Sequence, residues 1–449
     1  MSLYGELRNR AVAGEPVRVG LIGAGKFGSM FLAQARRTPG LRVVAIADLS
    51  IERARAACRG VGWPDEAYAA PDIDAARKTG ATFITDDALA MVGADGLDVV
   101  VEATGSPAAG IAHALAAFAR GRHVVMVTVE ADVLAGPLLA RRARDAGVVY
   151  SLAYGDQPAL ICELVDWARA IGFEVVCAGK GTKYLPAYHA STPDTVWQLY
   201  GMTPEKAAAG GLNARMFNSF IDGTKSSIEM AAVANACGLM PGADGLGFPP
   251  STARGLANVC RPRADGGTLE RKGTVEVVSS LERDGAEIAD DLRWGVYVTF
   301  EAPDDYVRRC FDEYGLATDE SGRYAVMYKP YHLIGFELGI SVASAALRGE
   351  PTGCAEGFRA DVVATAKRDL AAGEVLDGEG GYTVHGRLMP AADSLRLGAL
   401  PLGLSHDVKL VNAVAAGEVV HWADVVIDEA DATVAFRREM EAAFAGGET

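Results

Sequence analysis

The sequence predicts an α/β protein with a doubly wound parallel sheet, an α+β domain after it and a small β-rich domain at the end. Three observations support this fold class. Short runs rich in Val and Ile alternate with helical patterns between residues 17 and 150, which is typical of a doubly wound parallel sheet. A glycine-rich turn at residues 20–28 joins the first run to the first helical pattern. Near the end of the chain, the strand-and-turn pattern of residues 370–376 recurs at residues 414–420.

Composition disfavours several classes of function. A formal net charge of -15 argues against a nucleic-acid-binding protein, because such binding depends on neutralising phosphates. No apolar run approaches the roughly 20 residues that cross a bilayer, and the first residues lack the pattern of a secretory signal. The 7 cysteines are scattered and form no C-x-x-C pair, which favours reduced thiols. We therefore expect a cytoplasmic protein without a membrane helix.

The turn at residues 20–28 carries the pattern G-x-G-x-x-G, formed by Gly23, Gly25 and Gly28. Between a strand and a helix, the first glycine allows the tight turn and the second lets the backbone approach a pyrophosphate. The third allows the helix to pack closely on the strand. The pyrophosphate then lies at the helix N-terminus. The pattern therefore predicts a dinucleotide site on a Rossmann-type domain.

The ends of the following strands supply further candidates for the cofactor. Asp48 ends the second strand, where a carboxylate accepts the ribose hydroxyls of NAD. Such a carboxylate repels the 2′-phosphate of NADP, whereas Arg53 offsets this repulsion, so NAD and NADP both stay open. Thr104 to Ser106 and Glu130 follow the next core strands, near the expected nicotinamide, with ordinary strand-end turns as the alternative. The residues assigned to the cofactor here are Gly23, Ala24, Gly25, Lys26, Phe27, Gly28, Asp48, Arg53, Thr104, Gly105, Ser106 and Glu130.

The 449 residues are too many for one compact core and suggest two or three domains. We expect an NAD(P)-binding Rossmann domain at residues 1–155, with its core at residues 17–155. A catalytic or substrate domain is expected at residues 156–355, where longer polar loops replace the regular alternation. The β-rich domain then covers residues 356–449.

Several segments, in the same order across residues 17–350, resemble homoserine dehydrogenases. They include V-V-E-A-T-G-S, C-A-G-K-G-T-K-Y-L and P-Y-H-L-I-G-F-E-L-G. In that family a T-A-N-K turn ends the nucleotide domain, an N-G-T segment follows, and an Asp and a Lys share one helix. Here Ala131 replaces the turn lysine, and Lys180 and Lys183 stand in the N-G-T segment. Lys225 and Glu229, four residues apart on one helical face, reverse the order of acid and lysine.

The repeated pattern at residues 370–376 and 414–420 resembles a SAF domain. Together with D-G-T-K-S-S-I-E and P-Y-H-L-I-G-F-E, it makes nearly the whole chain similar to the 1-deoxyxylulose-5-phosphate reductoisomerase-like proteins. The resemblance implies rearrangement of a ketose phosphate to a branched aldehyde and its reduction with NADPH, in isoprenoid precursor synthesis. The clustered lysines suit a phosphate or carboxylate and a developing oxyanion.

This resemblance also implies roles for individual residues. Lys225 and Glu229 are expected to transfer protons and to stabilise an oxyanion. Asp156 is expected to orient a hydroxyl or to help hold a divalent ion, although the sequence does not identify metal ligands. The catalytic candidates are Lys225, Glu229, Asp222, Lys183 and Asp156. The substrate-binding candidates are Lys180, Asn218, Ser219, Lys329 and His332. Residues 333–347 resemble the segment of homoserine dehydrogenases that returns to the cofactor, so Glu337 is assigned to the cofactor.

Alternative interpretations stay open at this point. A homoserine-dehydrogenase-like dehydrogenase, or an oxidoisomerase of a sugar acid, would act on a substrate without phosphate. A nucleotide-binding sensor would have no need of the lysines. Lys225 as a solvated helix lysine and His332 as a structural histidine are the plain alternatives for these two residues. We expect a small anionic substrate, no nucleic-acid or membrane partner, and a homodimer or a higher homo-oligomer.

Overall fold

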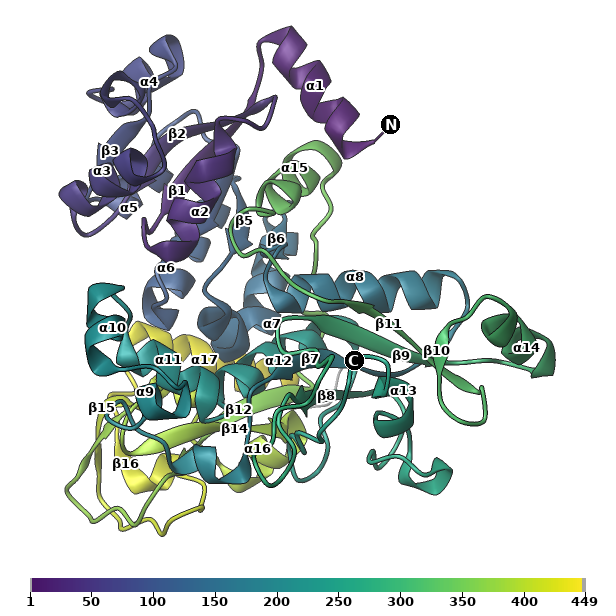
Figure 1. Cartoon of the computed structure of the whole chain (residues 1–449). Coiled ribbons are helices and arrows are strands. Elements are labelled where there is room, and N and C mark those ends of the chain that lie inside the picture. Colours follow the sequence, from purple (N-terminus) through teal and green to yellow (C-terminus); the bar gives the residue numbers. More distant parts are fainter. Residues whose placement is uncertain (1, 446–449) are drawn as a thin grey trace. The chain divides into compact units, whose positions relative to one another are not determined.

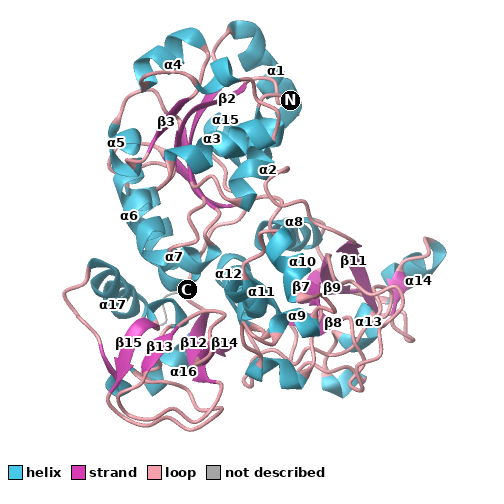
Figure 2. Ribbon diagram, turned by 60° about the vertical axis from the view of Figure 1, so that its left-hand side comes forward, coloured by secondary structure: helices cyan, strands magenta, loops and turns pink. Residues whose placement is uncertain are grey.

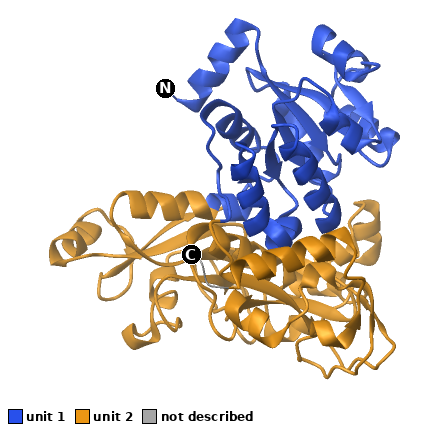
Figure 3. Ribbon diagram, turned by 180° about the vertical axis from the view of Figure 1, so that it is seen from behind, with its two compact units in different colours: residues 1–160, 332–355 blue, residues 161–331, 356–449 orange. Residues whose placement is uncertain are grey.

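The structure is a computed structural model that describes residues 2–445. The chain forms two compact units (Figure 3). Unit 1 contains Met1–Leu160 and His332–Ala355, and unit 2 contains Ile161–Tyr331 and Glu356–Thr449. The segment after residue 331 therefore belongs to the same unit as the glycine-rich turn. The predicted catalytic domain up to residue 331 and the predicted β-rich domain are grouped in unit 2.

Unit 1 is built on a six-stranded sheet with the order β3-β2-β1-β4-β5-β6 (Figures 1 and 2). All of its strand pairs are parallel. This is the strand order of a doubly wound dinucleotide-binding domain, and it confirms the α/β fold class. The Val- and Ile-rich strands are buried because helices cover such sheets. The strands are β1 (Val17–Ile22), β2 (Leu41–Ala47), β3 (Phe83–Thr85), β4 (Val99–Glu102), β5 (His123–Met126) and β6 (Tyr150–Leu152).

Several helices of unit 1 begin at side-chain caps. Ser50 accepts a hydrogen bond from the backbone N–H of Arg53, and Ser106 caps a helix whose first residue is Pro107. Helix α15, from the late segment of the chain, packs on β1, β4, β5 and β6. The helices are α1 (Leu3–Ala13), α2 (Lys26–Ala35), α3 (Ile51–Gly60), η1 (Asp65–Tyr68), α4 (Ile73–Thr79), α5 (Ala88–Gly93), α6 (Pro107–Phe118), α7 (Val129–Asp145) and α15 (Gly339–Arg348), while α8 (Gln157–Ala170) continues into unit 2.

The first half of unit 2 is built on a mixed five-stranded sheet with the order β10-β11-β9-β7-β8. β7 and β8 are parallel, and the other pairs are antiparallel. The strands are β7 (Glu174–Thr182), β8 (Thr274–Ser279), β9 (Val296–Glu301), β10 (Ala317–Thr318) and β11 (Tyr324–Lys329). The helices are η2 (Pro186–Ala190), α9 (Val196–Leu199), α10 (Pro204–Ala209), α11 (Ala214–Ile221), α12 (Thr224–Cys237), α13 (Leu256–Val259), η3 (Arg263–Asp265) and α14 (Asp305–Glu313).

Helix α12 is the central helix of unit 2. It packs on β7 and β8 and also on β12 (Ala360–Ala366) and β14 (Val384–Pro390). Every residue of α12 except Lys225 is buried. The many Ala and Ser residues of α12 allow strands to approach it from both sides, and a helix that is buried all round needs no polar face.

The end of the chain forms a β-rich region around α12, as the repeated pattern predicts. β12 and β14 are antiparallel, and β13, β15 and β16 form a second small sheet. Leu370 and Val414, which begin the two copies of the repeat, exchange backbone hydrogen bonds of 2.8 and 2.9 Å. The first residues of the two copies therefore pair with each other. The other elements are β13 (Val375–Asp377), α16 (Ala391–Leu397), η4 (Leu402–Leu404), β15 (His406–Leu410), η5 (Trp422–Asp424), β16 (Val425–Val426) and α17 (Ala432–Phe444).

Candidate nucleotide site and candidate active site

The glycine-rich turn of unit 1 has the geometry of a dinucleotide loop. Gly23 has a φ of 97°, and a Cβ there would lie 2.3 Å from the carbonyl oxygen of Ala103. A Cβ on Gly28 would lie 2.3 Å from the carbonyl oxygen of Gly23, so the helix packs closely on the turn. Gly25 is the N-cap of α2, and a Cβ there would meet no described atom within 4 Å. The first N–H groups of α2 thus have an open approach for a phosphate, with Lys26 and Phe27 in its first turn.

Asp48 is buried at the end of β2 and is tied to this turn. Its carboxylate accepts hydrogen bonds of 2.9 Å from the backbone N–H groups of Ala24 and Ser50. Arg53 contacts the same carboxylate at 2.5 Å while most of its own side chain stays exposed. Burial by itself would raise the pKa of Asp48, but the hydrogen bonds from Arg53, Ser50 and Ala24 outweigh it and lower the pKa. An ionised carboxylate and an exposed guanidinium therefore lie side by side where the adenosine ribose is expected.

Replacing Arg53 with alanine is expected to lower the affinity for NADPH relative to NADH by about tenfold, which corresponds to about 1.4 kcal/mol. The change removes a cation that can pair with the 2′-phosphate and leaves the negative charge of Asp48 uncompensated. Both effects disfavour NADPH, so the ratio of the two dissociation constants is the quantity to measure, by titration of cofactor fluorescence. Arg55→Ala is the matched control, because Arg55 lies on the same helix and pairs with Glu52 instead of Asp48. An unchanged ratio in Arg53→Ala would contradict the assignment.

A buried carboxylate that the sequence analysis missed lies at the end of β4. Glu102 is fully buried and accepts hydrogen bonds from the hydroxyls of Thr104 (2.6 Å) and Thr128 (2.5 Å). The Thr128 hydroxyl also accepts a hydrogen bond of 3.0 Å from the backbone N–H of Gly105. The turn after β4 is thus held at the carboxyl edge of the sheet, where Ser106 caps α6. Glu130 lies half-buried in the first turn of α7.

A charged residue directly after a run of valines was the available signal for Glu102. A second missed carboxyl, Asp132 on α7, is fully buried and accepts a 2.9 Å hydrogen bond from the Tyr150 hydroxyl. Burial raises the pKa of Asp132 to about 7. No local pattern in the sequence indicated this pair, since its partner lies on a distant strand.

The returning segment of the chain lies beside the glycine-rich turn within unit 1. A Cβ on Gly335 would lie 2.6 Å from the carbonyl oxygen of Phe27. A Cβ on Gly155 would lie 2.9 Å from the Cβ of Glu337, whose carboxylate accepts a hydrogen bond from the backbone N–H of Leu333. The structure therefore brings Glu337 close to the turn that carries Asp156, which accepts a hydrogen bond from the backbone of Gln157. His332 begins the same segment and is half-buried.

In unit 2, the structure brings Lys180 and Glu229 together. Lys180 lies near the carboxyl end of β7 and forms an ion pair with Glu229 of α12, with both side chains at least nine-tenths buried. Close backbone packing holds the strand here, because a Cβ on Gly179 or Gly181 would overlap the carbonyl of a neighbouring strand or turn. Lys225 is half-buried one helical turn before Glu229, on the same side of α12.

Lys183 and Lys329 contact other groups. The ammonium of Lys183 donates a 2.7 Å hydrogen bond to the carbonyl of Leu199, and burial, followed by the charge of Arg293, lowers its pKa. Lys329 on β11 forms an ion pair with Glu163 of α8.

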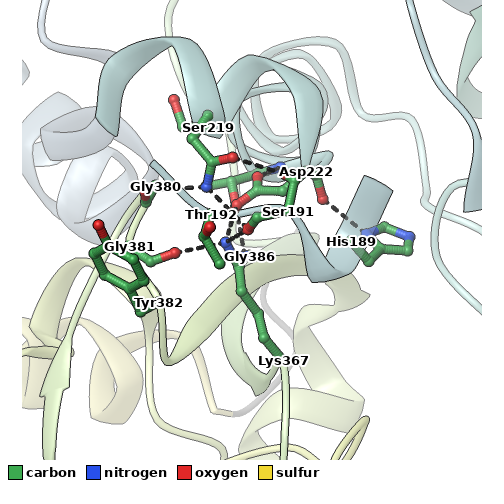
Figure 4. A network of polar contacts seen from close by, with 12 residues as sticks. His189, Ser191, Thr192, Ser219, Asp222, Lys367, Gly380, Gly381, Tyr382 and Gly386 are labelled. Atoms are coloured by element: carbon green, nitrogen blue, oxygen red, sulfur yellow. Dashed lines mark hydrogen bonds and ion pairs between the residues drawn. The ribbon is translucent and has the colours of Figure 1, made fainter. Parts of the chain in front are cut away.

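Asp222 and Ser219 belong to a polar network between the end of α11 and the start of α12 (Figure 4), and Asn218 hydrogen-bonds within the same network. Asp222 pairs with Lys367 at 2.7 Å and accepts a 2.9 Å hydrogen bond from the backbone N–H of Thr224. Lys367 also donates to the carbonyls of Ser191 and Gly381, 2.8 Å away in each case.

The amide of Asn218 contacts Ser191 and the carbonyl of Gly380, and the Ser219 hydroxyl donates to the carbonyl of Met216. The polar groups of these three predicted residues are thus engaged within the chain. Lys367, almost 150 residues away in sequence, was missed because nothing local marks its partner.

Two models of known protein families match parts of the chain. Residues 17–130 match the NAD-binding Rossmann fold of an oxidoreductase family (Gfo/Idh/MocA). Residues 155–338 match the catalytic domain of the oxidoreductase DRL. Both models describe oxidoreductases. The two matches together support an NAD(P)-dependent oxidoreductase with a nicotinamide cofactor.

Solved structures with related folds include several dehydrogenases. An NAD-binding oxidoreductase from Klebsiella pneumoniae is 20% identical, with 39% of this chain and 47% of that chain covered and a TM-score of 0.29. A homoserine dehydrogenase from Thiobacillus denitrificans is 21% identical over 50% and 49% of the two chains, with a TM-score of 0.36. A probable dehydrogenase from Thermotoga maritima is 14% identical over 74% and 90%, with a TM-score of 0.39.

The chain covers about half the length of the Klebsiella pneumoniae oxidoreductase and of the Thiobacillus denitrificans homoserine dehydrogenase. No curated protein matches it.

Metal-ligand clusters and membrane-spanning helices are both missing from the described residues. Within residues 2–445, no group of three or more His, Cys, Asp or Glu side chains is arranged to hold a metal ion. The divalent ion considered for Asp156 is therefore not supported by a ligand cluster in that part of the chain. None of the helices in the described range is long and apolar enough to cross a membrane.

Proposed function

We propose that this oxidoreductase rearranges and reduces a small phosphorylated ketose, in the manner of the 1-deoxyxylulose-5-phosphate reductoisomerase-like proteins. The observation that carries the proposal is the buried pair of Lys180 and Glu229, with Lys225 one helical turn away. These three residues lie in the segment that matches the DRL oxidoreductase catalytic domain. An ordinary dehydrogenase of an uncharged alcohol would not require two lysines beside one buried carboxylate.

The proposed reaction needs three kinds of help from side chains. A substrate hydroxyl loses its proton while a carbon–carbon bond migrates to the carbonyl carbon, and the former carbonyl oxygen takes up a proton. Glu229 is suited to accept the first proton, and the ammonium groups of Lys180 and Lys225 are suited to stabilise the oxyanions that develop. Bound in unit 1, the reduced nicotinamide would supply the hydride that converts the new aldehyde to an alcohol. One hydride and one proton are then consumed for each molecule of product.

The charge of the predicted substrate follows from the same lysines. Glu229 neutralises Lys180, and the two lysines and this carboxylate together carry a net charge of +1. This excess positive charge favours a phosphorylated substrate near Lys225. The reciprocal pairing of the two repeats at residues 370 and 414 supports the SAF-like architecture proposed for the C-terminal region.

The test is an assay of the purified full chain with both reduced cofactors. We expect the absorbance of NADPH or NADH to fall with 1-deoxyxylulose 5-phosphate and to stay nearly constant with 1-deoxyxylulose. With homoserine and the oxidised cofactors, we expect little or no rise in this absorbance. Carbon-13 spectra of the product must show the branched skeleton. Turnover of homoserine or of a sugar acid without phosphate would replace this function with that of a simple dehydrogenase or an oxidoisomerase. Cofactor binding without turnover of any tested substrate would overturn an enzymatic role.

A further inference from the structure

A pocket of about 350 Å³ in unit 2 lies away from the Lys180–Glu229 pair. Its walls come from the turn around His189, from Ser227 on α12 and from the facing strands β12 and β14. Ser227 lies two residues from both Lys225 and Glu229, which is a rotation of about 200° around the helix. The pocket is therefore on the opposite side of α12 from the proposed catalytic side chains, facing the C-terminal strands rather than β7.

The register of β12 and β14 aligns three polar side chains on this face. Thr365 and His385 are directly paired across the two strands. Arg387 lies two residues beyond His385 on β14, and side chains two residues apart point to the same face of a strand. All three residues line the pocket.

Two of these side chains have buried polar atoms that lack a partner. Within residues 2–445, the Thr365 hydroxyl and the Nδ1 atom of His385 are buried and make no hydrogen bond. His385 is only 8% exposed, and burial, followed by the charges of His189 and Lys367, lowers its pKa to about 3, so its ring is neutral. Buried polar groups in folded proteins are almost always satisfied, so these two atoms at one cavity are suited to hydrogen-bond a polar molecule that enters it.

The charges around the pocket define the kind of ligand. Lys367 is neutralised by Asp222, and both ring nitrogens of His189 are engaged, with Tyr184 and with the carbonyl of Asp222. The backbone of Arg387 pairs with Val363 of β12, while its half-buried guanidinium forms no hydrogen bond or ion pair with a side chain of residues 2–445 and faces the pocket as a cation open to a ligand.

The remaining charge is Asp244, which is exposed and also lines the pocket. An anionic group fits the guanidinium of Arg387. Hydroxyl groups fit the Thr365 hydroxyl, the Nδ1 atom of His385 and the carboxylate of Asp244, because a hydroxyl can both donate and accept.

We propose that this pocket, formed by Thr365, His385 and Arg387 beside α12, is a second binding site for a small hydroxylated anion. Its ligand carries one carboxylate or phosphate on a short chain with at least one hydroxyl. The anion pairs with Arg387, and the hydroxyl occupies the buried end between Thr365 and His385. The site is separate from the proposed catalytic face, and the proposal does not depend on the reaction proposed above.

The experiment is titration calorimetry of the full chain with D-glycerate and with glycerol 3-phosphate, which distinguish a carboxylate from a phosphate ligand. We expect one of them to bind with a stoichiometry of one. Arg387→Gln should weaken that binding about tenfold or more, because a charge-assisted contact is lost. Thr365→Val, which keeps the shape of the side chain, should weaken it severalfold.

Two controls locate the bound probe. Arg254→Gln changes an exposed arginine of the same unit and should bind as the wild type does. Lys225→Ala should also leave the binding unchanged, since Lys225 lies on the other side of α12. Three results would each overturn the proposal. They are loss of binding in Lys225→Ala, unchanged binding in a normally folded Arg387→Gln, and no binding of either probe at about 10 mM.

Discussion

Lys225→Ala is expected to lower the turnover of the proposed reaction by two or more orders of magnitude. Cofactor affinity and the thermal unfolding midpoint should stay close to those of the wild type. Lys225 is the one residue of α12 that is not buried, and it lies one turn from the Glu229 carboxylate. Removing a group that stabilises a developing oxyanion, or that transfers a proton, typically costs 10²- to 10⁴-fold in rate. The measurement is kcat with the substrate that the assay identifies.

The matched control for this prediction is Lys206→Ala, on α10. Lys206 is exposed on a different helix of unit 2, so its removal changes the charge by the same amount without touching α12. A rate close to normal in Lys225→Ala would show that this lysine is a solvated helix residue. A large loss of thermal stability would show a structural role instead.

Arg437→Ala is expected to lower the free energy of unfolding of unit 2 by about 3–5 kcal/mol. Arg437 on α17 is fully buried, contacts the Asp361 carboxylate at 2.6 and 3.1 Å and pairs with Glu441 at 2.9 Å. Asp361 is the second residue of the buried strand β12 and is itself 1% exposed. Without the guanidinium its negative charge is buried and uncompensated, and that is the main source of the loss. Urea denaturation followed by circular dichroism measures the change.

Arg438→Ala is the control on the same helix. Arg438 is partly exposed and pairs with Glu441 at 2.8 Å, and exposed ion pairs of this kind contribute about 0–1 kcal/mol. Equal losses in the two variants would mean that the helix as a whole, rather than the buried pair with Asp361, stabilises the C-terminal region.

The nucleotide-binding half could be predicted in detail from the sequence. The alternation of strands and helices and the glycine-rich turn follow from local patterns, because the tight turn, the close helix packing and the phosphate approach each require glycine at a fixed spacing. The order of the strands in the sheet comes from the structure. Asp48 follows from the same spacing. The sequence places Arg53 close to Asp48, and the structure shows that the two side chains form an ion pair.

The candidate active site was predictable only in part. The face shared by Lys225 and Glu229 follows from helical periodicity. The partner of Glu229 is Lys180, 49 residues earlier on a strand, and the partner of Asp222 is Lys367, about 145 residues later in the chain. Such pairings depend on how a strand and a helix pack, and no local pattern encodes that. The return of residues 332–355 to unit 1 was expected from the resemblance to homoserine dehydrogenases and not from a local pattern.

The sequence alone predicted the α/β class, the dinucleotide loop and the repeat near the end of the chain. Each of these is recognised from patterns within short segments of the chain. Tertiary packing established which charges meet inside the protein. It placed α12 between two sheets, so that Lys225 and Glu229 lie on one side and Ser227 faces the pocket on the other. Burying a charge is costly without a partner, so the long-range packing, rather than the local pattern, selects the pairs of Lys180 with Glu229 and of Asp222 with Lys367.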